Sequence, residues 1–305
     1  MRITLLGPQR RPTLEAVAWS LYPEGQIATI TAGWQERESD DGELGKLLGA
    51  RDVNLGLYRR WLDVTERDPL FAAGERRLAE VLDEVQDAYL LRLDHALRAV
   101  YAVQRRGGNG RLRAGILAEA IGAVRDLDAA HLRRVAAIRG EFYAGLPPHE
   151  RTVIAGHRAE VAALLGDAAA LVVAGGHVGV LTDVLHLFNV AASLRAPVIA
   201  WSAGAMALAE RIVLFHDRAA HGPGHPEIYG SGLSLLRDVV PLPHARARLL
   251  LDDAPRMSVF ARRFAPARCV LLENGTRIDT SSDGIWPTGM RVLAPDGHVT
   301  TGEAA

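Results

Sequence analysis

Residues 197–208 read PVIAWSAGAMAL and pass from an apolar run, through a serine, into a series of small residues. The first part, residues 197–201, is a short aliphatic run of the kind that forms a buried parallel strand. After Ser202, the apolar positions between Ala203 and Arg211 have helical spacing. A strand that leads directly into a helix is the repeating unit of α/β proteins, in which helices cover a mostly parallel sheet.

Further runs extend this pattern over much of the chain. Short β-branched or aliphatic segments lie beside glycine-containing turns at residues 3–6, 26–31, 53–58 and 170–174. They predict further buried parallel strands, and helical spacing returns between residues 181 and 194. The expected fold class is therefore α/β, as a three-layer sandwich with a mostly parallel sheet.

One segment, residues 61–148, departs from this alternation. Apolar residues recur at steps of three and four along residues 78–103, with one extra step of four after Tyr89, which predicts a long helix with a stutter. The apolar positions are Leu78, Leu82, Val85, Tyr89, Leu93, Ala96, Val100 and Val103. A glycine-rich turn at residues 107–110 and renewed helical spacing over residues 117–138 then predict an antiparallel helical hairpin.

The expected organisation is an α/β domain formed by residues 1–60 and 149–305, with the hairpin of residues 61–148 inserted into it. The charged residues of the hairpin are typical of a solvated helix face. Its apolar seam could pack against its own domain, or it could act as a lid or join two copies of the chain in a homodimer. Both alternatives stay open on the sequence.

Composition excludes several classes of protein. Of 305 residues, 49% are hydrophobic and 23% are charged, which is typical of a folded globular chain. The net charge is -1, so neither nucleic acid nor an anionic membrane is an expected partner. No apolar stretch approaches the roughly 20 residues that span a bilayer, and the apolar run at the N-terminus is too short for a signal peptide. The expected location is the cytoplasm. The one cysteine, Cys269, lies in an apolar run and predicts a buried, unreactive thiol.

Ser202 is the candidate nucleophile. A serine between a strand and a helix, followed by Ala203, Gly204 and Ala205, matches a nucleophile elbow, where small neighbours let the helix pass close to the strand. Such a turn directs the N–H of Ala203 towards the place where an oxyanion would form. The alternative is that Ser202 only caps a helix.

A glycine pair ends another predicted strand. Gly175 and Gly176 follow the run at residues 170–174 and precede His177. Glycines allow close approach of the backbone to a ligand, and an N–H there can point into a site. Because ligands of open α/β sheets bind at the carboxyl ends of strands, Gly175 and Ser202 are expected on the same edge.

Four motifs follow one another in a recognisable order. They are Gly175-Gly176, Trp201-Ser202-Ala203-Gly204-Ala205, His244 within residues 240–248, and Glu273 within residues 271–276. In these motifs the sequence resembles the peptidase E and cyanophycinase family of serine peptidases, which has a class I glutamine-amidotransferase-like fold. Residues 29–34 are similar to the second strand of that family and the loop after it. The resemblance covers residues 1–58 and 150–300.

The resemblance implies a role for each matching residue. Ser202 would be the nucleophile, His244 the general base and Glu273 the acid that orients the histidine, while Gly176 and Ala203 would supply the N–H groups of an oxyanion hole. This mechanism proceeds through an acyl-enzyme and needs no metal or other cofactor. Asp217 is an alternative to Glu273, because its spacing after Ser202 also fits the family, and it could lie behind the triad instead.

The resemblance also implies a small peptide-like substrate, such as an aspartyl or β-aspartyl dipeptide or polymer. Gly175, His177 and Arg246 are expected to contact it, with Arg246 meeting an acidic group. His177 stands where the family commonly has asparagine, and members of the family commonly lack the hairpin. Both differences are expected to affect the specificity for the substrate. Glutamine amidotransfer is disfavoured, because it needs a cysteine at the elbow and Cys269 lies elsewhere.

The sequence offers two other interpretations. The chain could be a catalytically inactive module that binds a ligand or partner through the hairpin, in which case Ser202 would be unreactive. The histidines at 216, 221 and 225 resemble a metal site at first sight, but their spacing matches no standard zinc arrangement. No metal is therefore expected, and the three histidines are predicted to line a loop beside the active site.

Overall fold

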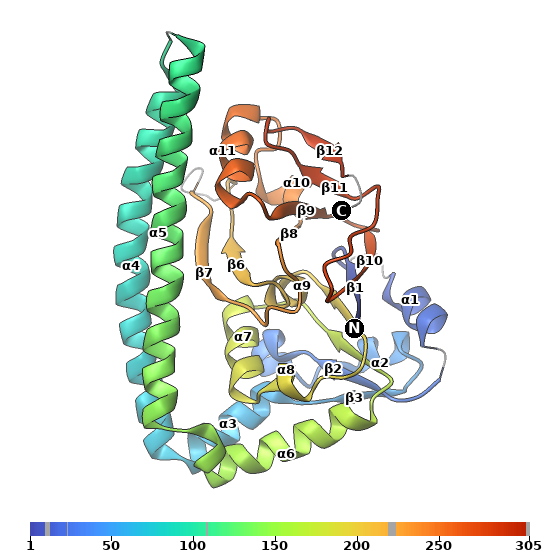
Figure 1. Cartoon of the computed structure of the whole chain (residues 1–305). Helices are drawn as coiled ribbons and strands as arrows, with labels where there is room; N and C mark the ends of the chain where they lie inside the picture. The colour runs from blue at the N-terminus through green and yellow to red at the C-terminus, as the bar shows by residue number, and fades with distance from the viewer. Residues whose placement is uncertain (10–12, 23, 108, 219–223, 303–305) are drawn as a thin grey trace.

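The computed structural model describes residues 1–9, 13–22, 24–107, 109–218 and 224–302 (Figure 1). Its largest sheet has the strand order β10-β1-β5-β4-β2-β3. The strands are β1 (Arg2–Leu6), β2 (Ile27–Ile30), β3 (Asp52–Asn54), β4 (Ala170–Val173), β5 (Val198–Trp201) and β10 (Arg277–Ser281). All pair in parallel except β10, which runs antiparallel to β1 at the sheet edge. The predicted α/β class with a mostly parallel sheet is confirmed.

Helices cover both faces of this sheet. Successive side chains of a strand point to opposite faces of the sheet. In these strands, the side chains on both faces are mostly apolar. Leu171 and Val173 of β4 face one core, whereas Val172 between them faces another. The first core includes residues of α3 (Leu57–Arg67), α6 (Thr152–Asp167), α7 (Val178–Leu187) and α8 (Val190–Ser193). The second includes residues of α1 (Leu14–Leu21) and α2 (Gly42–Leu47). The three layers follow from this alternation.

A second, smaller sheet was not expected from the sequence. Its order is β12-β11-β9-β8, and only β8 and β9 pair in parallel. Its strands are β8 (Val239–Pro243), β9 (Arg268–Leu272), β11 (Arg291–Leu293) and β12 (Val299–Thr301). Two short helices, α10 (Ala245–Arg248) and α11 (Ala254–Phe264), lie between β8 and β9 in the chain, and a separate ribbon pairs β6 (Arg211–Leu214) with β7 (Glu227–Ser231).

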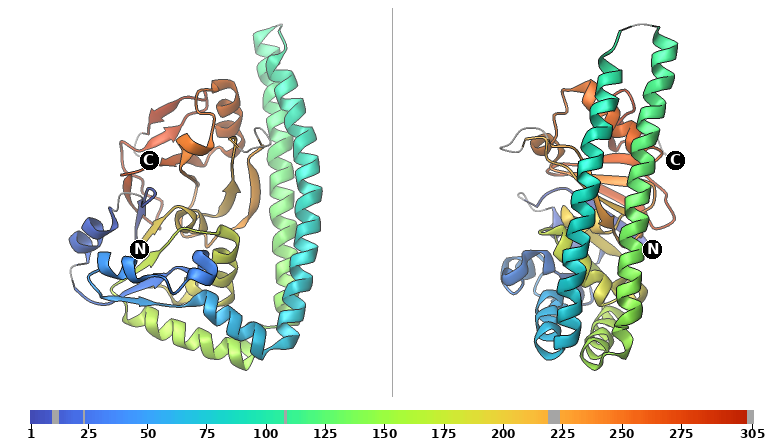
Figure 2. Two further views of the ribbon diagram at one scale, coloured as in Figure 1. Left: turned by 180° about the vertical axis from the view of Figure 1, so that it is seen from behind. Right: turned by 90° about the vertical axis from the view of Figure 1, so that its left-hand side faces the viewer.

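The helical hairpin predicted from the sequence is present. It consists of α4 (Pro69–Arg105) and α5 (Gly110–Gly145), which pack side by side along one flank of the body and extend beyond it (Figures 1 and 2). α5 contacts α11 and β7, and the apolar residues of both helices join the core of the second sheet. Part of the apolar seam therefore packs against the body, and a homodimer through the hairpin stays a prediction. The assignment of residues 61–148 as an insertion stays a prediction.

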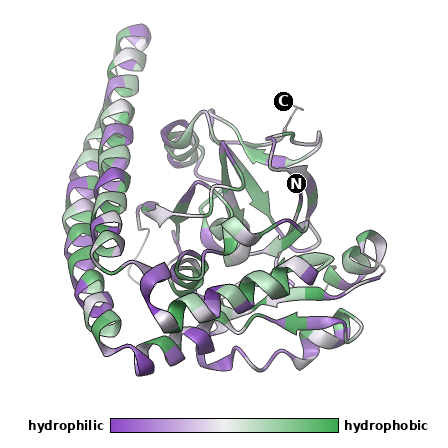
Figure 3. Ribbon diagram, turned by 60° about the horizontal axis from the view of Figure 1, so that its bottom comes forward, coloured by the Kyte–Doolittle hydropathy of each residue, from purple (hydrophilic) through white to green (hydrophobic). Residues whose placement is uncertain are grey.

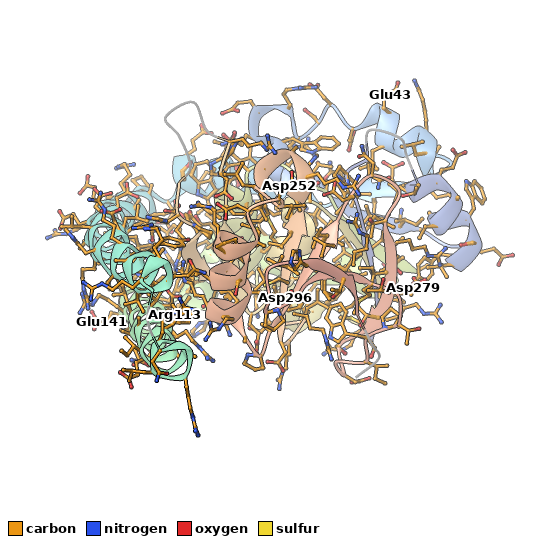
Figure 4. The ribbon with its side chains drawn as sticks, turned by 90° about the horizontal axis from the view of Figure 1, so that it is seen from above. Glu43, Arg113, Glu141, Asp252, Asp279 and Asp296 are labelled. Carbon is orange, nitrogen blue, oxygen red and sulfur yellow. The ribbon has the colours of Figure 1, made fainter. Side chains whose placement is uncertain are left out.

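The buried stripe of α4 differs from the prediction at one position after the stutter. Tyr89, Leu93 and Val100 are buried as predicted, but Leu97 is buried in place of Ala96, which is only half-buried. Figure 3 shows apolar strands inside the body and mixed polar and apolar positions along the hairpin. Seen along the hairpin (Figure 4), the labelled Arg113 and Glu141 both lie on α5, and both are exposed.

The prediction of a strand over residues 53–58 was wrong in its second half. β3 ends at Asn54, Gly56 adopts a left-handed conformation with φ of 59°, and α3 begins at Leu57. Leu55 and Leu57 are buried, which explains the error, because a short buried run looks alike in a strand and in the first turn of a helix. The helix predicted over residues 203–211 is likewise shorter, since α9 spans Ala203–Ala207 and β6 begins at Arg211. No helix in the described ranges combines the length and the apolar composition needed to cross a membrane.

Candidate active site

Ser202 lies at a strained turn between β5 and α9. Its φ of 51° and ψ of −122° are unusual for a residue that carries a side chain. α9 passes so close to β4 that a Cβ at Gly204 would lie 2.3 Å from the carbonyl oxygen of Val173. The small residues after Ser202 thus permit the turn, and the serine side chain stays partly exposed. This is the geometry that a nucleophile elbow requires.

The glycine pair lies against Ser202. A Cβ at Gly175 would come within 2.8 Å of the Ser202 Cβ, so a larger residue would displace the serine. Gly176 has a φ of 126°, and a Cβ there would lie 2.3 Å from the carbonyl oxygen of Gly33. The N–H of His177 donates to that same oxygen at 2.7 Å. The loop after β4 is therefore held between Ser202 and the loop after β2.

His244 and Glu273 follow neighbouring strands of the second sheet. Pro243 at the end of β8 pairs with Leu272 at the end of β9. His244 comes next, with a left-handed φ of 57°, and its N–H donates to the carbonyl oxygen of Leu272 at 3.1 Å. The Glu273 Oε1 accepts the backbone N–H of Arg246 at 2.7 Å. Both side chains are partly exposed, and the parallel pairing brings them to one edge.

Gly7 connects this edge to the large sheet. It follows β1, whose last residue, Leu6, pairs with Trp201 just before Ser202. The Gly7 N–H donates to the carbonyl oxygen of Thr276 at 2.9 Å, and a Cβ at Gly7 would lie 1.6 Å from the carbonyl oxygen of Glu273. The turn that begins at Glu273 thus lies against the end of β1, next to the strand that ends in Ser202.

Asp217 is part of a buried ion pair. Its Oδ1 lies 2.6 Å from Nη2 of Arg256, and its Oδ2 accepts the Leu250 N–H at 3.1 Å. The Asp217 N–H donates to the carbonyl oxygen of Arg248 at 2.7 Å. Burial opposes the charge of Arg256, but the contact with Asp217 outweighs this effect and raises the arginine pKa. Asp217 therefore holds in place the segment that follows α10.

Two residues expected to contact the substrate, His177 and Arg246, are exposed. The His177 Nδ1 accepts the N–H of Val180 at 3.2 Å at the start of α7. Sequence reasoning missed Gln35, in the η1 turn (Ala32–Arg37) after β2, whose φ of 57° and ψ of −123° nearly repeat those of Ser202. No sequence pattern marks a glutamine for this conformation.

Neither the histidines nor the cysteine form a second centre in the described ranges. His225 Nε2 lies 3.5 Å from Asp94 Oδ1 on the hairpin, His216 is exposed, and His221 falls outside the described residues. Within the described part, no group of three or more His, Cys, Asp or Glu side chains is arranged to hold a metal ion. Cys269 is buried as predicted, and burial raises the pKa of its thiol to about 12.

Comparison with known proteins gives only distant likenesses among the solved structures. No family model matches the chain, and no curated protein matches it. One solved structure that it resembles is a peptidase from an acI-B1 Actinobacterium, with 13% sequence identity and a TM-score of 0.46. The match covers 100% of this chain and 96% of that chain. The strand pairing and the two cores define the α/β fold independently of this likeness.

Proposed function

We propose that the chain is a serine peptidase or amidase in which Ser202, His244 and Glu273 form the catalytic triad. The observation that supports this most is the backbone conformation of Ser202, with Gly175 packed against its side chain at the carboxyl edge of a parallel sheet. Strained backbone conformations of this kind are concentrated at active sites. The proposed fold family is the class I glutamine-amidotransferase-like fold of peptidase E and cyanophycinase.

In the proposed reaction, His244 accepts the proton of Ser202 while Oγ bonds to the amide carbonyl carbon. The N–H groups of Gly176 and Ala203 donate to the oxyanion. The C–N bond then breaks, and His244 passes its proton to the departing amine. A water molecule, deprotonated by His244, hydrolyses the acyl-enzyme and restores Ser202.

Glu273 is the preferred acid of the triad. It follows the strand that pairs with β8, and one of its carboxylate oxygens accepts a backbone N–H from the segment after His244. Both oxygens of Asp217 already accept hydrogen bonds, from Arg256 and from the Leu250 N–H. Asp217 is instead a positioning residue, because it contacts Arg248, the last residue of α10, and Leu250 just after it. α10 begins directly after His244.

The proposed substrates are aspartyl or β-aspartyl peptides, with Arg246 meeting the acidic group. We expect Arg246→Gln to lower kcat/KM for an aspartyl dipeptide about 10–100-fold, because a charge-assisted hydrogen bond contributes roughly 1.5–3 kcal/mol. An alanyl dipeptide should be cleaved by both forms at equal rates. Steady-state kinetics with both substrates measure this, and Arg291→Gln, at another exposed arginine, is the control. Equal losses on the two dipeptides would exclude this role for Arg246.

Gly175→Ala should slow the reaction of Ser202 with a fluorophosphonate about 10–100-fold, because the new methyl group would meet the Ser202 Cβ. It would displace a nucleophile that must be placed within a fraction of an ångström. The rate of reaction with a fluorophosphonate measures this. Gly122→Ala, in α5 where a Cβ meets nothing within 4 Å, is the control and should react at the native rate. A native rate in Gly175→Ala would contradict the proposed geometry.

A second candidate function is binding of a partner through the hairpin. The observation in its favour is the protruding tip, where Leu112 and Ile116 are 65% and 43% exposed. A homodimer formed through the hairpin stays a prediction, which sedimentation velocity would check.

A further inference from the structure

A cavity lies where the hairpin meets the body, and no residue of the proposed triad lines it. Tyr229 of its wall and His177 both lie beside Gly179. Its volume is about 430 Å³, within the range of roughly 300–1,000 Å³ that small-molecule sites occupy. Its walls come from α5, α6, α7, β7 and the η2 turn (Pro148–Glu150). Residues of the hairpin form one wall, so the cavity depends on the hairpin.

The lining carries one unbalanced positive charge. Arg139 lies 2.8 Å from Asp183, and this contact outweighs the effect of burial and raises the pKa of Arg139. Arg158 also lines the cavity, but its Nε donates only to the backbone carbonyl oxygen of Leu187, at 2.7 Å. In the described part of the chain no carboxylate pairs with Arg158, and burial lowers its pKa. Among the lining residues, two guanidinium groups thus face one carboxylate. Glu75, outside the lining, also interacts with Arg139, and burial raises the pKa of its carboxyl group.

The other polar groups of the lining are neutral. Burial lowers the pKa of His186, whose Nε2 donates to the carbonyl oxygen of Ser231 at 3.3 Å. Burial raises the pKa of Tyr143 to about 12 and also raises that of Tyr229. Neither tyrosine is therefore ionised at neutral pH. The charge of Arg158 has no compensating group of its own, and a half-buried cation of this kind favours an anion.

The rest of the wall is apolar or aromatic. Val135 and Pro148 add aliphatic surface to the two tyrosine rings. Such a lining suits a ligand with a flat apolar body and one anionic group. A carboxylate fits the arginine best, since a guanidinium group can donate two parallel hydrogen bonds to it.

We propose that this cavity is a binding site for a small carboxylate with an aromatic or apolar body, whose anionic group pairs with Arg158. The site is separate from the triad, so the proposal does not depend on hydrolase activity. The test of this binding site requires no substrate of the proposed peptidase. Failure to bind a carboxylate would therefore not contradict the proposed catalytic triad, and the reverse also holds.

The test uses para-fluorobenzoate as the probe and the full chain, with binding followed by fluorine NMR. We expect saturable binding, with a Kd at least tenfold lower than that of neutral para-fluorobenzamide. Arg158→Gln should raise the Kd for the acid about tenfold or more, because it removes a charge-assisted hydrogen bond. Arg195→Gln is the matched control, since Arg195 also donates to backbone carbonyl oxygens but is exposed and outside the cavity.

A second variant fills the cavity itself. Gly230 is buried and lines the cavity, yet a Cβ there would meet no heavy atom within 4 Å, so Gly230→Leu should extend into the empty space and abolish binding. Gly230→Leu decides the question if Arg158→Gln does not fold. Absence of saturable binding to the native chain would overturn the proposal. So would equal binding by the acid and the amide, or native affinity in Gly230→Leu.

Discussion

Asp128→Asn should lower the free energy of unfolding by about 3–5 kcal/mol, which is the usual cost of leaving one partner of a buried ion pair uncompensated. Asp128 on α5 and Arg263 on α11 have side chains only 6% and 2% exposed. Both carboxylate oxygens accept from the guanidinium group at 2.7 Å. The Tyr89 hydroxyl donates to Asp128 at 2.9 Å and accepts from Arg263. The pair therefore fastens both helices of the hairpin to the body.

Urea unfolding, monitored by the circular dichroism of the helices, measures this change in the free energy of unfolding. Asp126→Asn is the matched control, because Asp126 is exposed on the same helix, and it should change stability by ~0.5 kcal/mol or less. The double variant Asp128→Leu/Arg263→Met should lose less free energy of unfolding than Asp128→Leu and Arg263→Met lose in sum, because it leaves no charge unpaired. Equal midpoints for Asp128→Asn and Asp126→Asn would show that the pair does not hold the hairpin.

The central strand and the hairpin could be predicted because their signals are local. Residues 197–208 show the change from a strand to a helix within one segment, and β5 and α9 follow it. The hairpin follows from the helical spacing on both sides of a glycine-rich turn. The place where the hairpin packs on the body could not be predicted. In the sequence, nothing distinguishes Asp128, which pairs with the buried Arg263, from the solvent-exposed charged residues of the same helix.

The second sheet was missed for a related reason. β8 and β9 are parallel neighbours with two helices between them in the chain. Pairing over such a separation depends on tertiary packing, which a single sequence does not display. The resemblance to a known family did point to His244 and Glu273. It did not reveal that the two residues follow neighbouring parallel strands.

Close approaches of the backbone were the hardest part of the site to foresee. Gly7 follows a predicted strand, a position where glycine often allows another backbone to approach, and this signal could have marked it. Nothing in the sequence distinguishes Gln35, because its positive φ is imposed by the turn after β2. The cavity beside Arg158 needs four separated segments and the η2 turn to form its wall, so it becomes visible only in the folded chain.

The second large effect is expected at the proposed nucleophile. Ser202→Ala should lower kcat/KM for peptide hydrolysis by about 10³–10⁶, because it removes the group that forms the acyl-enzyme and leaves only binding and oxyanion stabilisation. His244→Ala should cost a similar factor. The double variant should be little worse than either, because the two residues act as a unit. Progress curves with an aspartyl dipeptide measure all three, and additive losses would contradict a shared role.

Labelling by a fluorophosphonate tests the central claim most directly. The native chain, Ser202→Ala and His244→Ala would each be treated with the probe, and the site of the adduct would be found by mass spectrometry. The account predicts one adduct per native chain, on Ser202, and none in either variant. An adduct on another residue, or equal labelling of Ser202 when His244 is replaced, would contradict it.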